Sequence, residues 1–312
     1  MLFIGAFAFI NSVNSNKNYP LYDETKKGIF NIIFFAVPTI LIFTIYCTFR
    51  LEIANYWNNL YADSFIQINP GNEGYSDYVR NSDLKKFKSI WIINYTLFFL
   101  SVLCFTNIKK LKNQQLGLFN LGFIVFTLLV FLVQGLYHLS ELRESYLNGN
   151  LSQYYHRGII YLWMRYISFS FVALALFTGY KCIKEGLAPS NFKMGFELFL
   201  HTTILWIIGS ELITWMEIFQ IEQSYKLGLS ILCGVYAMFL IILGIWKKKQ
   251  PLRIGAIVLF GITLVKLFFY DIAHLNTIAK TIVFVSLGIM LLIISFLYNK
   301  YKHLISDDEV SS

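Results

Sequence analysis

The chain has 312 residues, of which 56% are apolar and only 14% are charged. So few charged side chains cannot cover a water-soluble globule of this size, which excludes the soluble classes of enzyme and binding protein. The formal net charge of +8 does not indicate nucleic acid as a partner, because the basic residues form short clusters between apolar segments and not one basic face.

Apolar segments recur along the chain at lengths that fit a lipid bilayer. A hydrocarbon core of about 30 Å needs about 20 residues of α-helix. We therefore predict an all-α, polytopic transmembrane helix bundle with eight full spans. The first ten residues are too short to cross alone, and we interpret residues 1–27 as a partial N-terminal apolar segment followed by a cytoplasmic loop. The predicted spans are residues 28–50, 89–107, 116–137, 159–180, 194–216, 226–246, 254–272 and 278–299.

Lysine is concentrated in alternate loops, which predicts the orientation of the chain. Cytoplasmic loops carry an excess of Lys and Arg. The loop over residues 51–88 is also basic, although it belongs to the alternate set of loops on the opposite side of the membrane. Long loops count little in this rule. The C-terminus, including the polar tail at residues 305–312, is therefore expected in the cytoplasm. The clusters that set this orientation are Lys109, Lys110 and Lys112; Lys181, Lys184 and Lys193; and Lys247, Lys248, Lys249 and Arg253.

An internal repeat relates the two halves of the chain. A shift of 136 residues places Thr127–Leu139 on Thr263–Leu275, with matching Thr, Leu, His and Leu residues, and each segment follows a Lys-rich turn. The repeat predicts two four-span units, residues 28–180 and 181–304. Because each unit holds an even number of spans, the two should be parallel and related by an axis along the membrane normal.

Four ionisable residues are predicted to lie in the outer third of the membrane. Such residues are costly in lipid unless they are paired or hydrated. We interpret them as a candidate intramembrane polar pocket, in which Glu211 is the expected partner of Lys266 and Arg165 competes with it. The alternative is a buried ion-pair network that only fixes helix packing. The four residues are Arg165, Glu211, Lys266 and Asp271.

The span over residues 194–216 carries a weaker polar pattern. Glu197 and His201 lie near its inner end on the same face as Glu211, but Ile204 and Ile208 interrupt that face. This inner-end pair could relay protons, bind a metal ion or make ordinary helix contacts. A second group of polar residues is expected at the outer face, and it consists of His138, Glu141, His156 and His274.

No catalytic or cofactor motif accompanies these residues. The sequence lacks a His-Glu-x-x-His segment, a Gly-x-Ser-x-Gly elbow, a Walker loop and a dinucleotide fingerprint, and its four cysteines are scattered singly. We therefore predict neither a metal nor a cofactor, and we assign no catalytic residue.

The C-terminal quarter of the chain, Tyr225–Tyr301, carries a distinctive set of residues. They are Lys226, Leu227 and Ser230, the basic turn ending at Leu252 and Arg253, the Thr263, Lys266, Asp271 and Leu275 pattern, and Gly288, Leu297 and Tyr298. In these residues the chain resembles the bacterial predicted membrane proteins grouped as domain of unknown function 2339. Members of that family are usually longer, so the chain is expected to correspond to their final portion. The resemblance implies a multi-pass protein of the bacterial cytoplasmic membrane, and it implies no reaction.

Three functions remain open from the sequence. The polar pocket could serve the transport or sensing of a small solute. Alternatively, the outer-face groups could act as acid and base in a membrane-embedded transferase or hydrolase of an envelope lipid or glycan. A third alternative is a structural scaffold of an envelope complex. The expected partners are the lipid bilayer and either other envelope proteins or further copies of the chain, with no nucleic acid.

Overall fold

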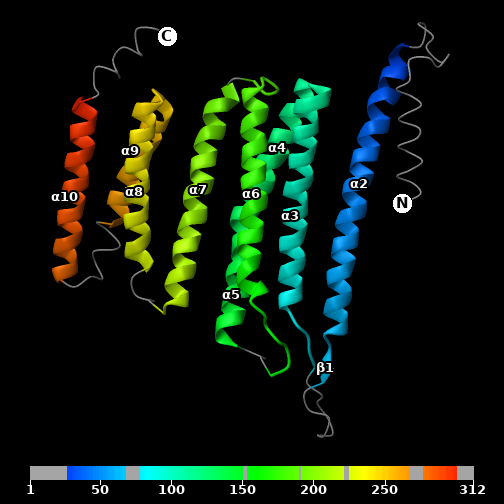
Figure 1. Ribbon diagram of the computed structural model, residues 1–312, viewed down its shortest axis with the longest axis horizontal. Helices are drawn as coiled ribbons and strands as arrows, with labels where there is room; N and C mark the ends of the chain where they lie inside the picture. Colours follow the sequence, from blue (N-terminus) through cyan, green and yellow to red (C-terminus); the bar gives the residue numbers. More distant parts are fainter. Residues whose placement is uncertain are drawn as a thin grey trace.

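The computed structural model describes residues 27–67, 78–149, 153–189, 191–220, 225–267 and 277–300, which are almost entirely helical. Helices α2, α3, α6, α7, α8 and α10 stand side by side in a row, and α4 and α5 pack behind α3 and α6 (Figure 1). The elements are α2 (Lys27–Asp63), β1 (Ile66–Gln67), β2 (Tyr78–Val79), α3 (Asp83–Thr106), η2 (Asn107–Leu111), α4 (Gln114–Val130), η3 (Phe131–Gly135), α5 (Leu136–Asn148), α6 (Ile160–Lys184), α7 (Asn191–Ile218), α8 (Tyr225–Trp246), α9 (Gln250–Lys266) and α10 (Thr277–Lys300).

Within the described residues, six helices are long and apolar enough to cross a membrane. They correspond to the first six predicted spans, so the all-α, multi-spanning class is confirmed. Helices α9 and α10 overlap the last two predicted spans, and the full count of eight stays a prediction. Residues 1–26 and the tail at 305–312 lie outside the described part of the chain. The six helices are Ala36–Asp63, Asp83–Leu111, Gln114–Asn148, Ile160–Lys184, Asn191–Ile218 and Gly228–Trp246.

The first span is longer than the sequence predicted. We expected a loop from residue 51, but α2 continues to Asp63 and is followed by the two-stranded antiparallel pair β1–β2. No Gly or Pro interrupts residues 51–63, and Trp57 in this extension stacks on Phe87 of α3 at 5.3 Å between ring centroids. We call this end of the bundle the hairpin end. The opposite end, with η2 and the α6–α7 and α8–α9 turns, is called the lysine-rich end.

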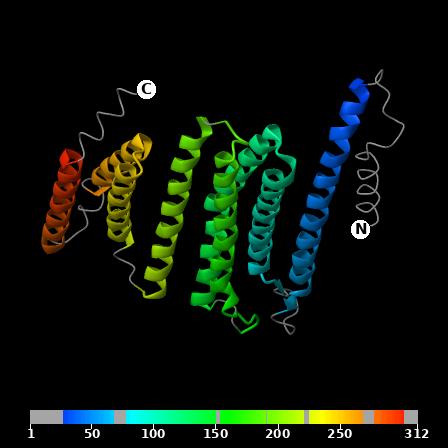
Figure 2. The same ribbon diagram turned by 45° about the horizontal axis from the view of Figure 1, so that its top comes forward.

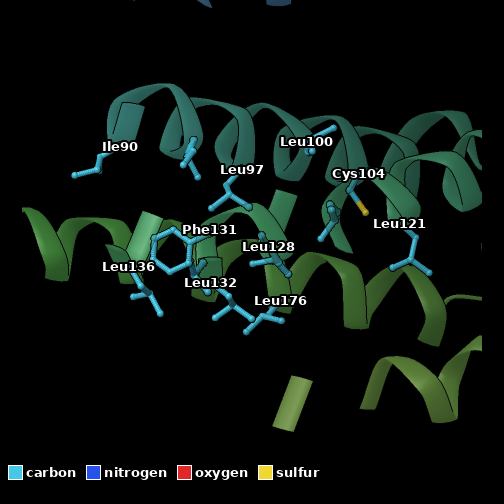
Figure 3. Close-up of a cluster of buried hydrophobic side chains, with 14 of the residues drawn as sticks. Ile90, Leu97, Leu100, Cys104, Leu121, Leu128, Phe131, Leu132, Leu136 and Leu176 are labelled. Carbon is cyan, nitrogen blue, oxygen red and sulfur yellow. The ribbon is translucent and has the colours of Figure 1, made fainter. Parts of the chain in front are cut away.

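The main apolar core lies between α3, the continuous α4–η3–α5 segment and α6 (Figure 3). On α3 the buried residues recur every three or four positions, as in Leu97, Leu100 and Cys104, and they form one apolar stripe along the helix. The π-helical turn η3 joins α4 to α5 without a break in the helix. Gly135 leaves room for the ring of Phe131, because a Cβ at this position would lie only 2.7 Å from that ring. This core holds α5 and α6 at fixed positions.

A smaller apolar cluster joins α8 to α9 and includes Tyr236, Leu240, Ile241 and Ala256. Both views of the protein place α7 between α6 and α8 (Figures 1 and 2). Helix α7 therefore packs against the first cluster on one side and the second on the other.

A buried carboxylate fixes the hairpin end. Asp83 is only 2% exposed and begins α3. Its oxygens accept from Lys86 Nζ at 3.2 Å, from Ser145 Oγ of α5 at 2.8 Å, and from Arg157 Nε at 3.2 Å. Because Arg157 lies in the segment that leads into α6, this clamp joins three parts of the chain.

The same segment is attached to the strands through Tyr155. The Tyr155 hydroxyl donates to the backbone oxygens of Ser64, at 2.6 Å, and Val79, at 3.0 Å. Burial raises the pKa of this phenol, because the phenolate would lose its hydration. The start of α6 is thus held by hydrogen bonds to both sides of the hairpin.

Candidate functional site

Helix α6 carries a buried arginine about 7.5 Å beyond its first residue, Ile160. Arg165 is 3% exposed, and its Nε donates to Glu211 Oε2 of α7 at 2.7 Å. Its Nη2 donates to Ser210 Oγ, and its guanidinium lies 5.5 Å from the ring centroid of Phe169. A buried guanidinium is tolerated only with such partners, since each ion loses several kcal/mol of hydration.

The partner carboxylate is itself held by three donors. Besides Arg165, Glu211 accepts from the Tyr166 hydroxyl at 2.7 Å and from Trp215 Nε1 at 2.9 Å. Trp215 is one helical turn after Glu211, so both side chains leave α7 toward α6. The negative charge of Glu211 is therefore well compensated.

A second buried arginine approaches from α5. Arg143 is 5% exposed, its Nη1 donates to Thr214 Oγ1 at 2.9 Å, and its Nη2 forms an ion pair with Glu217. Ser210, Thr214 and Glu217 follow each other at i, i+4 and i+7 along α7. This spacing places them on one face, which meets both arginines.

The two arginines line a cavity of about 320 Å³ between α5, α6 and α7. We call it the arginine pocket. Its walls are mainly aliphatic and aromatic, and it lies near the hairpin end. The lining residues are Leu139 and Arg143 of α5; Ile159, Tyr161, Leu162, Trp163, Arg165 and Tyr166 at the start of α6; and Thr214, Trp215 and Ile218 at the end of α7.

Each arginine keeps a donor that no described residue accepts. Arg165 Nη1 and Arg143 Nε are buried and have no hydrogen-bond partner within the described part of the chain. Buried donors are normally satisfied, and leaving one unpaired costs about 1–3 kcal/mol. Because both arginines line the same cavity, that cavity is a candidate site for a ligand with acceptor oxygens.

Of the predicted polar pocket, the structure brings Arg165 and Glu211 together. Lys266 lies at the end of α9 and donates to Ser230 Oγ of α8 at 2.7 Å, whereas Glu211 is engaged by donors of α6 and α7. Arg165, which the sequence left as the competing partner, pairs with Glu211. Asp271 lies outside the described residues.

The inner-end pair of α7 joins other neighbours. Glu197 forms an ion pair with Lys249 in the α8–α9 turn, and His201 Nδ1 is 3.0 Å from the Tyr236 hydroxyl of α8. These contacts lie on α8 and α9, whereas Glu211 meets α6. Within the described residues, no three His, Cys, Asp or Glu side chains gather closely enough to hold a metal ion.

The outer-face groups are not gathered around the arginine pocket. His138 Nδ1 is 3.3 Å from Glu141 Oε2 one turn later on α5, and His156 is exposed. Glu141 instead borders a separate polar cavity of about 160 Å³ with Lys86, Glu144, Ser145 and Asn148. His274 lies outside the described residues.

Sequence reasoning missed Arg143 as a site residue. The signal for it was the Ser210, Thr214 and Glu217 stripe of α7, whose three polar side chains on one face require donors from a neighbouring helix. Tyr166 and Trp215 carried no comparable signal, because aromatic residues are frequent at every membrane interface.

Comparison with known proteins gives one family. A family model described as "Predicted membrane protein (DUF2339)" matches residues 21–301. No curated protein and no solved structure matches the chain.

Proposed function

The chain belongs to this family of predicted membrane proteins, and we propose that it senses a small ligand through the arginine pocket. The proposal is carried by Arg165 and Arg143, which line one cavity of about 320 Å³. Each has one buried donor, Nη1 and Nε respectively, without an acceptor among the described residues. A site with apolar walls and a few convergent polar groups is the usual form of a ligand pocket.

Sensing is favoured over transport by the partners of α7. A transporter needs a polar route between both membrane faces, and Glu197 and His201 would be its inner part. Their contacts with Lys249 and Tyr236 lead to α8 and α9, away from the α5 and α6 side chains around the pocket. The lining residues of the pocket lie in α5, at the start of α6 and at the end of α7, on the side of the hairpin end.

An outer-face enzyme is supported less well. Acid–base catalysis needs a titratable group within hydrogen-bond reach of the substrate. The described lining of the pocket contains no His, Asp or Glu, and its titratable groups besides the arginines are Tyr161 and Tyr166. The Tyr166 hydroxyl already donates to neighbouring Glu211, which accepts from three donors in all. A scaffold would use the ion pairs of Arg165 and Arg143 but would not require a cavity between them.

We propose eight spans arranged as two four-span units, residues 28–180 and 181–304. In support, α4 and α9 are both 17 residues long and are displaced by 136 positions at each end. The turns before them also correspond, since Lys112 and Lys248 have positive φ angles of 51° and 52°. Non-glycine residues rarely adopt this conformation, so its recurrence at the same displacement is informative.

The proposed location is the bacterial cytoplasmic membrane, with the lysine-rich end and the C-terminus in the cytoplasm. Lysines of η2, of the end of α6 and of the α8–α9 turn lie together at this end, as the positive-inside rule requires of cytoplasmic loops. The arginine pocket then opens on the outer half. Beyond the lipid bilayer, proposed partners are other envelope proteins or a second copy of the chain.

Thiol labelling tests whether the pocket is open and from which side. Leu162→Cys places a thiol in the wall, and Leu174→Cys on the exposed face of the same helix provides the matched control. The background is Cys47→Ser with Cys233→Ser, because these cysteines are only half-buried. In sealed vesicles, a membrane-impermeant reagent should label Leu162→Cys from the hairpin side alone, since thiolates react in water.

Other labelling patterns have different meanings. Labelling from both sides would favour transport. If the Leu162→Cys variant is as inert as the Leu174→Cys variant, the cavity is dry and the proposal is wrong in favour of a scaffold.

A further inference from the structure

We propose that the ligand of the arginine pocket is the phosphodiester group of a membrane lipid, which reaches the pocket between α6 and α7. This inference rests on the proposed ligand-binding function and specifies its chemical class. Three features carry it: the geometry of the free donors, the charge of the site, and the position of the pocket mouth in the bilayer.

The free donors match a phosphate group. Guanidinium groups are planar and always charged, and they bind phosphate oxygens through several N–H groups at once. Arg165 commits Nε and Nη2 to α7 and retains Nη1, while Arg143 commits both Nη atoms and retains Nε. Among the described residues, each arginine thus has one donor left that could bind a phosphate oxygen.

The charge of the site disfavours a multiply charged ligand. Arg165 is paired with Glu211, and Arg143 with Glu217, so these four groups have no net formal charge. A multiply charged soluble phosphate would meet two carboxylates without an excess of positive charge to offset them. A phosphodiester carries one negative charge and still offers acceptor oxygens.

The walls and the mouth fit a lipid better than a soluble ion. Ile159, Trp163 and Trp215 border the pocket and are 64%, 56% and 46% exposed. Tryptophan prefers the boundary between hydrocarbon and headgroups, where lipid phosphates lie. Helix α6 has 25 residues, about 37 Å, and exceeds a 30 Å core by a few ångströms at each end. Arg165, one and a half turns into the helix, can thus reach this boundary.

Binding to the full chain in a maltoside detergent separates the lipid from its parts. The probes are phosphatidylglycerol, diacylglycerol with the same acyl chains, and deacylated glycerophosphoglycerol, with native mass spectrometry for the lipids and tryptophan emission for all three. We expect phosphatidylglycerol to bind and diacylglycerol, which lacks the phosphate, not to bind. The deacylated headgroup should bind at least about tenfold more weakly, because it buries no apolar surface in the mouth.

Arg165→Lys tests the donor geometry, with Arg50→Lys on the exposed side of α2 as the matched control. Lysine can keep the ion pair with Glu211, but its single ammonium group has no second nitrogen that could replace the Nη1 donor. Loss of one charge-assisted hydrogen bond should weaken phosphatidylglycerol binding about tenfold or more. The Arg50→Lys variant should bind as the parent does.

A second variant covers the case in which Arg165→Lys unfolds. Ile159→Trp enlarges an exposed side chain at the mouth and touches neither ion pair. It should weaken phosphatidylglycerol binding severalfold while the melting temperature stays unchanged.

Three outcomes would overturn the inference. Equal binding of diacylglycerol would remove the role of phosphate, and equal binding by the two Arg→Lys variants would remove the role of Arg165. Equal affinity for glycerophosphoglycerol would overturn the lipid assignment and leave the proposed function intact. If no probe binds although Leu162→Cys is labelled, the inference fails alone; without that labelling, the proposed function fails as well.

Discussion

Replacing Asp83 by Asn tests whether the buried carboxylate holds the hairpin end together. Asp83 accepts from Lys86, Ser145 and Arg157 and is 2% exposed. Asparagine keeps one acceptor oxygen, which can still serve Ser145. Its amide nitrogen would face Arg157 Nε, which now donates to the second oxygen, and the negative charge at the start of α3 would be lost.

The magnitude follows from the burial of the partners. Removing one member of a buried ion pair costs about 3–5 kcal/mol, because the other charge is left without compensation. The side chains of Arg157 and Lys86 are 10% and 19% exposed, so some hydration remains and the lower end of this range applies. We expect Asp83→Asn to lower the free energy of unfolding by about 3 kcal/mol.

The assay is unfolding of the purified chain in detergent, followed by tryptophan emission. Asp63→Asn, at the exposed end of α2, is the matched control and should change stability by less than about 0.5 kcal/mol. Equal stability of the two variants would refute the reasoning, because the clamp would then contribute no more than a surface carboxylate.

Three further tests probe separate contacts. A Cβ at Gly117 would come within 2.4 Å of a backbone oxygen of the α6–α7 turn, whereas a Cβ at Gly122 on the same helix would meet open space. The free energy of unfolding of Gly117→Ala should therefore be lower than that of Gly122→Ala by about 1–3 kcal/mol. Burial raises the pKa of Tyr155 above its ordinary value of 10.0, so its contribution to stability is full below pH 10 and is lost as the pH rises further. Tyr155→Phe should therefore flatten the fall in melting temperature above that pH. A double-mutant cycle of Glu197→Gln with Lys249→Met should give a coupling of about 1 kcal/mol, and a coupling near zero would show that this ion pair does not fix α7 to the α8–α9 turn.

The spans were predictable because lipid imposes a simple requirement on sequence. Every backbone group in the membrane must be paired, so a long apolar segment has helix as its main solution. The end of α2 was not predictable from hydropathy, since residues 51–63 mix polar and aromatic side chains. That extension depends on a tertiary contact, the stacking of Trp57 on Phe87.

The sequence predicted the membrane depth of the site residues, but it predicted their ion-pair partners only in part. Counting residues along each span placed Arg165, Glu211 and Lys266 at similar depths, and depth alone left two cations competing for one carboxylate. Neighbouring helices decide between them. Because α6 packs against α7, Glu211 meets Arg165, and because α8 packs against α9, Lys266 meets Ser230.

The stripe of Ser210, Thr214 and Glu217 shows how far one helix can specify its neighbour. Three acceptors at helical spacing in an apolar span require donors on a facing helix, since unpaired polar groups are costly in lipid. The stripe does not reveal that those donors are two arginines from different helices. It also does not reveal that Arg165 Nη1 and Arg143 Nε remain available after the stripe is satisfied. Which nitrogen of each arginine is left without an acceptor depends on the planar geometry of the guanidinium and on the angle at which it approaches α7. The feature that points to a ligand therefore appears only when three helices are assembled.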